Sequence, residues 1–165
     1  NGATVRPGTG AASNNLTLES DITFVGGSTL AIDVADTSNS QLVIAGGTLD
    51  LSDLSPTNKL NIHLSAIGEL TPNQPREISI INAIGGTINY GSGFEATHFN
   101  IVPEGFAFED GFTLTGTETG LTIAFTPVPV PEPAAVLGIA VGALAVGGFV
   151  RRRFPKLVPV RSRGA

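Results

Sequence analysis

Residues that could perform acid–base or metal chemistry are few in this chain and widely spaced. The two histidines, His63 and His98, each lack a second kind of ligand at metal-binding spacing, so we expect neither to hold a metal ion. His63 falls on an alternating segment, on the same side as Asn61, which favours a solvent-facing strand position. The sequence also contains no nucleophile elbow, phosphate-binding loop or zinc-protease motif.

Carboxylates offer the remaining route to catalysis. Glu109-Asp110 is the only adjacent acidic pair and precedes Gly111, a pattern typical of a solvated turn. Asp33 together with Asp50 or Asp53 would suit calcium binding or glycoside hydrolysis if stacked strands brought them face to face, although no calcium-loop spacing is present. We therefore expect a protein without enzymatic activity, cofactor or metal.

The elements that must position these residues are strands. Short segments alternate apolar and polar residues, as half-buried strands do, and stretches rich in Asp, Asn, Ser and Pro separate them. The alternating segments are 16–18, 29–34, 48–51, 59–64, 113–115 and 121–125. Residues 1–126 are accordingly predicted to form one all-β region.

Three glycine pairs suggest a repeat within that region. Gly26-Gly27, Gly46-Gly47 and Gly85-Gly86 each precede a hydroxyl residue and an aliphatic one, and their starts are separated by 20 and 39 residues. A unit of about 20 residues favours the end of a parallel β-helix, or solenoid, with a β-sandwich as the alternative. Five of the nine Phe lie between residues 94 and 112, and the hairpin expected over 112–125 would cap the open end. A ligand groove lined by these Phe is the alternative to a core or cap.

Composition excludes several classes of protein. With no Cys, the 165-residue chain has no disulfide framework, thiolate metal site or cysteine nucleophile. Only 14% of its residues are charged, against about 25% in an average soluble domain. Residues 1–150 hold all 14 acidic residues and three basic ones, a net charge of −11, whereas residues 151–165 carry +6. The acidic body argues against a nucleic-acid partner.

The composition changes after Thr126. Residues 127–133 place a proline at every second position and are predicted to form a stiff spacer. Residues 134–150 carry no charge and predict a transmembrane α-helix, and the basic tail 151–165 predicts a cytoplasmic end. Within the apolar segment, Gly138 and Gly142 form a GxxxG pattern, a candidate for helix packing.

This order of features resembles a known sorting signal. Val130-Pro131-Glu132-Pro133, a short apolar span and the cluster Arg151, Arg152 and Arg153 resemble the PEP-CTERM signal of Gram-negative bacteria. The resemblance implies that an exosortase, a membrane transpeptidase, processes the chain near the motif. Arg151, Arg152 and Arg153 would orient the chain in the membrane. Residues 16–125 resemble, less specifically, autotransporter-associated β-strand repeat proteins.

The expected function is that of an exported structural or adhesive protein. It would pass through an inner-membrane intermediate with its β region in the periplasm and reach the cell surface or extracellular matrix. The expected partners are the exosortase and inner-membrane lipid, with exopolysaccharide as a further candidate. Two alternatives stay open, namely a permanently membrane-anchored surface protein and the C-terminal part of a β-helix enzyme acting on polysaccharides.

Overall fold

Strands account for most of the residues that the computed structural model describes, which are 2–8 and 14–130. One short 3-10 helix, η1 (Ala96–His98), accompanies them. The strands, in chain order, are β1 (Thr4–Val5), β2 (Asn15–Leu18), β3 (Ile22–Thr23), β4 (Thr29–Val34), β5 (Gln41–Ile44), β6 (Thr48–Asp50), β7 (Leu60–Ala66), β8 (Arg76–Ala83), β9 (Thr87–Asn89), β10 (Phe99–Glu104), β11 (Ala107–Thr117) and β12 (Gly120–Val128).

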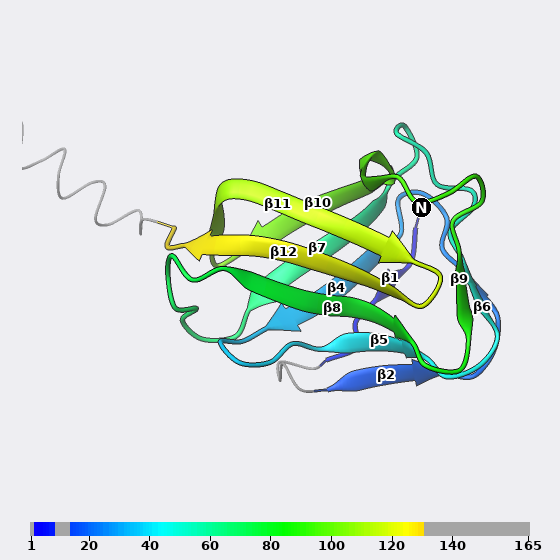
Figure 1. Cartoon of the computed structure of the whole chain (residues 1–165), viewed down its shortest axis with the longest axis horizontal. Coiled ribbons are helices and arrows are strands. Elements are labelled where there is room, and N and C mark those ends of the chain that lie inside the picture. Colours follow the sequence, from blue (N-terminus) through cyan, green and yellow to red (C-terminus); the bar gives the residue numbers. More distant parts are fainter. Residues whose placement is uncertain (1, 9–13, 131–165) are drawn as a thin grey trace, which may run out of the picture. The chain divides into compact units, whose positions relative to one another are not determined.

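These strands form three sheets. The first has the order β1-β4-β7-β10, the second β11-β12-β8-β5-β2 and the third β3-β6-β9. Consecutive strands therefore visit the three sheets in turn, and each strand pairs in parallel with the strand three places later in the chain, from β1 with β4 to β7 with β10. Figure 1 shows the second sheet nearest the viewer and the short strands β6 and β9 at the right-hand side.

The second sheet departs from this regular order. β12 runs antiparallel to β8, and β11 runs antiparallel to β12, so parallel and antiparallel strands share one sheet. The prediction of a parallel β-helix followed by a transmembrane α-helix is therefore wrong for this chain. The alternative of a β-sandwich with such a helix is wrong too, because there are three sheets.

The transmembrane expectation needs its own correction. No helix among the described residues is long and apolar enough to cross a membrane. The segment 134–150, on which that prediction was made, lies outside the described residues, together with the tail 151–165. β12 continues through Pro127 and Val128, so the first two residues of the predicted spacer belong to the last strand.

The core lies where the inward faces of the sheets meet. Alternation in β4 and β7 places Leu30, Ile32, Ile62 and Leu64 inside with no exposed surface. Paired strands stack these residues in columns, with Leu30 beside Ile62 and Ile32 beside Leu64. Burying an aliphatic side chain of this size stabilises the fold by about 1.5–3 kcal/mol. Stacked apolar columns thus hold the sheets together.

The predicted 20-residue repeat is also wrong. Paired residues are 25 to 27 apart between the first three strands and the next three, as in Thr4 with Thr29 and Ile22 with Leu49. The next pairings are 32 or 39 residues apart, as in Leu30 with Ile62. The cause is that the glycine pairs lie at different corners. Gly26-Gly27 precedes β4, whereas Gly46-Gly47 and Gly85-Gly86 link the second sheet to the third.

Candidate functional site

The predicted sorting motif begins where the described chain ends. Val130 follows β12 and is 53% exposed. Pro131, Glu132 and Pro133 lie outside the described residues, as do Gly138, Gly142, Arg151, Arg152 and Arg153. The chain divides at the same point into two units, Asn1–Val130 and Pro131–Ala165.

The structure does not bring the two histidines together. His63 lies half-buried on β7, between Ala31 of β4 and Val102 of β10. The Nε2 atom of His98 lies 3.5 Å from a carboxylate oxygen of Glu95 at the short helix η1. Within residues 2–8 and 14–130, no group of three or more His, Asp or Glu side chains is placed to hold a metal ion.

The carboxylates singled out in the sequence are also held apart. Asp33 is completely buried on β4 in the first sheet, where Arg6 donates a hydrogen bond of 2.6 Å to it. Asp50 belongs to β6 in the third sheet, and the side chain of Asn89 donates to its carboxylate at 3.0 Å. Hydrogen bonds from Ser52 hold the pKa of Asp50 below its usual value, with a smaller contribution from Asn89. Each carboxylate therefore bonds to partners of its own, Asp33 to Arg6 and Asp50 to Ser52 and Asn89, and the two do not form a joint site.

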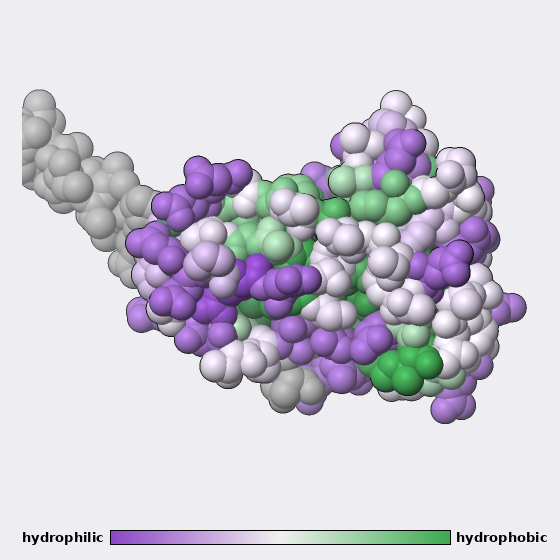
Figure 2. Space-filling model, viewed as in Figure 1, coloured by the Kyte–Doolittle hydropathy of each residue, from purple (hydrophilic) through white to green (hydrophobic). Residues whose placement is uncertain are grey.

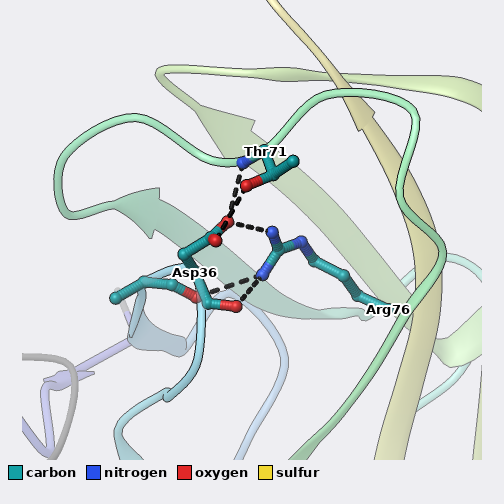
Figure 3. Close-up of polar contacts among 4 residues, drawn as sticks. Asp36, Thr71 and Arg76 are labelled. Carbon is teal, nitrogen blue, oxygen red and sulfur yellow. Dashed lines mark hydrogen bonds and ion pairs between the residues drawn. The ribbon is translucent and has the colours of Figure 1, made fainter.

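A polar cluster that the sequence did not single out lies at the start of β8. The Asp36 carboxylate accepts hydrogen bonds from the backbone N–H and the hydroxyl of Thr71, at 2.7 and 2.8 Å (Figure 3). The Arg76 guanidinium donates to the same carboxylate and to the backbone carbonyls of Ala35 and Asp36. The Thr71 N–H, the Thr71 hydroxyl and Arg76, in that order, lower the pKa of Asp36 from 3.8 to about 2.

Two surface hollows adjoin Arg76. One, of about 210 Å³, lies against the turn that carries Asp36. The other, of about 300 Å³, lies among β8, β11 and β12, and its lining includes Arg76, Asp110 and Phe112. Figure 2 shows apolar residues along the course of β11 on this face, next to hydrophilic residues towards β8. The larger hollow is therefore the best candidate for a binding site in the described part of the chain.

A bulge in β11 shapes the larger hollow. The pairing with β12 shifts register between Phe108 and Phe112, so Glu109, Asp110 and Gly111 face no partner residue there. Gly111 has a φ of +88°, a conformation that glycine adopts without strain. The acidic pair expected in a solvated turn thus lies in a strand bulge.

Sequence reasoning missed Arg76, and for the group of Phe that includes Phe112 it favoured a core or cap over a ligand groove. Arg76 is one of only three Lys or Arg residues among the first 150 residues, which are otherwise acidic. This rarity is the one sequence signal that could have drawn attention to it. Phe112 belongs to the group of Phe expected to form a core or cap, yet it is 41% exposed whereas Phe99 and Phe106 are buried. Alternation alone cannot indicate that a bulge exposes one ring of such a group.

The chain was compared with known proteins at three levels. No protein-family model, curated protein or solved structure matches it.

Proposed function

We infer that this chain is an exported, non-enzymatic structural or adhesive protein of the cell surface or extracellular matrix. Its Val130-Pro131-Glu132-Pro133 sequence serves as the recognition motif for a membrane transpeptidase of the exosortase kind. The resemblance of this motif and its basic cluster to a bacterial sorting signal is the basis of the proposal. Processing would deliver the β region to its destination after passage through the cell envelope.

The position of Val130 is the observation that carries the proposal. β12 ends at Val128, and Val130 is 53% exposed directly after it. A transpeptidase must seat its substrate as an extended segment, and prolines at 131 and 133 favour extended backbone on either side of Glu132. Val130, the first residue of the motif, is thus accessible to such an enzyme.

The character of the β region supports a structural role. Polar side chains on paired strands bond to each other 39 residues apart, as in Asn100 with Asn61 at 2.9 Å and Asn89 with Asp50 at 3.0 Å. Ser65 and Glu104 pair in the same way at 2.9 Å. Side-chain hydrogen bonds of this kind contribute about 0.5–1.5 kcal/mol each. The polar side chains on the outer surface of these sheets thus reinforce strand pairing.

Sorting of a Glu132→Ala variant tests the proposal. The full-length gene is expressed in a Gram-negative host with and without an exosortase, and the surface-released protein is analysed by mass spectrometry. We expect the wild-type product to be cleaved near residue 133 only when the exosortase is present, and the variant to stay cell-associated and uncleaved.

The matched control is Glu118→Ala, which removes an exposed carboxylate from the turn between β11 and β12. This variant should be sorted as the wild type is. Equal release of the Glu132→Ala variant would contradict recognition of the motif. Retention of both the wild type and the variant at the membrane, with the exosortase present, would favour a permanent membrane anchor. A released protein that still contains residues 134–165 would contradict processing altogether.

A further inference from the structure

The larger hollow beside Arg76 combines an exposed aromatic ring with polar groups. Its volume of about 300 Å³ lies at the lower end of the range of about 300–1,000 Å³ typical of ligand pockets. The β11 bulge opens it on one side, and Pro75 and Arg76 at the start of β8 bound it on the other. A hollow of this volume is large enough for a small cyclic molecule.

The aromatic ring of Phe112 is held in place and partly uncovered. Its centroid lies 5.4 Å from that of Phe108, which in turn lies 5.4 Å from that of Phe125. Packing against this cluster limits the freedom of the Phe112 side chain, yet 41% of the residue stays exposed. An immobilised and accessible ring offers its electron-rich face to polarised C–H groups at little cost in entropy.

Polar side chains adjoin this ring. The Asp110 carboxylate is exposed on the bulge, and Arg76 belongs to the same lining. The Arg76 guanidinium keeps its Nε buried and without a hydrogen-bond partner among the described residues. A carboxylate and a guanidinium together can bond adjacent hydroxyl groups of a ligand, each of which both donates and accepts.

Charge decides which class of ligand fits. Residues 1–130 carry 13 of the 14 acidic residues and only the basic residues Arg6, Lys59 and Arg76. The charge of Arg76 is already paired with Asp36, and Asp110 adds a negative charge to the lining. This excess of negative charge would repel an anionic ligand, whereas it would not repel an uncharged molecule with many hydroxyl groups.

We propose that this hollow binds a neutral hexopyranose unit of a polysaccharide, with the C–H face of the sugar stacked on Phe112. Asp110 and Arg76 bond the hydroxyl groups at the sugar's edge. This inference rests on the proposed function, because it gives the class of matrix molecule that the protein would contact. Sugar binding is nevertheless a property of the isolated chain, so its failure would leave the sorting of the Glu132→Ala variant as a separate test.

Binding is tested with linear hexamers of glucose, mannose and galactose and with the galacturonic acid hexamer as the anionic probe. The full chain is used in a buffer free of sugar-headed detergents, because these would compete for the site. At least one neutral hexamer should bind, and better than the anionic probe does. Phe112→Ala should weaken that binding at least about tenfold, whereas Phe112→Tyr, which keeps the ring, should retain it.

Two further variants separate the site from general effects on folding. Ile84→Ala removes an apolar side chain that is 74% exposed and not part of the hollow, and its binding should equal that of the wild type. Asp110→Ala changes an exposed position on the bulge and should weaken binding while the melting temperature stays unchanged. The proposal is overturned if no neutral hexamer binds, if the galacturonic acid hexamer is preferred, or if both Phe112→Ala and Asp110→Ala bind as the wild type does.

Discussion

Arg76 and Asp36 form an ion pair that joins two segments 40 residues apart in the chain. Asp36 lies in the turn after β4, in the first sheet, and Arg76 begins β8, in the second. Thr71 adds two hydrogen bonds from the loop that leads into β8 (Figure 3). A single carboxylate therefore fastens this loop to the turn after β4.

The acid stability of the protein should depend on this carboxylate. The pKa of Asp36 is lowered from 3.8 to about 2 in the folded protein, so its stabilising contribution is present above pH 3.8 and is lost as the pH falls through about 2. Asp36→Asn cannot titrate. Urea denaturation should show the wild type to be the more stable near neutral pH, with the difference vanishing at about pH 2. A difference that stays constant with pH would contradict this role of the charge.

The buried ion pair of Arg6 with Asp33 should stabilise the attachment of the first strands. Asp33 is completely buried and Arg6 is 47% exposed, with 2.6 Å between Nη2 and Oδ1. Arg6→Ala takes this cation away from a buried carboxylate and should lower the free energy of unfolding by about 1–2 kcal/mol, since the half-exposed arginine is partly screened by water. The measurement is urea denaturation followed by circular dichroism. Arg6→Lys should lose less, and Arg6→Ala in an Asp33→Asn background should cost less than it does alone.

Strand positions could be predicted from the sequence because burial repeats every second residue. In β4, Leu30, Ile32 and Val34 all point inward, and the alternate residues Thr29 and Ala31 are partly exposed. Asp33 breaks this pattern, since it is buried on the opposite side of the strand where Arg6 reaches it. Local alternation thus reports which segments are strands.

Strand pairing could not be predicted in the same way. The pairing of Leu49 with Ile88 depends on how much chain the intervening strands and turns take up, and no local pattern records that length. Similar glycine pairs occupy dissimilar corners, so their spacing gave a false period. The Arg76 site needed the β11 bulge and a contact across 40 residues, and both arise only when the sheets are assembled.

Close stacking at the corners should make Gly85 intolerant of a side chain. A Cβ at Gly85 would lie 2.3 Å from the Ala45 carbonyl oxygen, whereas a Cβ at Gly46, on the same corner of the preceding strands, would lie 3.2 Å from the Glu19 carbonyl oxygen. Gly85→Ala should therefore lower the free energy of unfolding by about 2 kcal/mol or more, and Gly46→Ala by less. Thermal unfolding of the two variants checks this, and equal melting temperatures would contradict the close approach.

The column formed by Ile22, Leu49 and Ile88 in the third sheet should show how burial grows along the stack. Leu49 pairs with both of the other residues and has no exposed surface, whereas Ile22 on the edge strand β3 is only half-buried. Leu49→Ala should cost about 3 kcal/mol of unfolding free energy, within the range for buried leucines, because it removes a large side chain from between two neighbours. Ile22→Ala should cost less than half as much, since part of that side chain already contacts water. Urea denaturation of the full chain measures both, and a cost at Ile22 equal to that at Leu49 would mean that further apolar material covers the edge of the sheet beside β3.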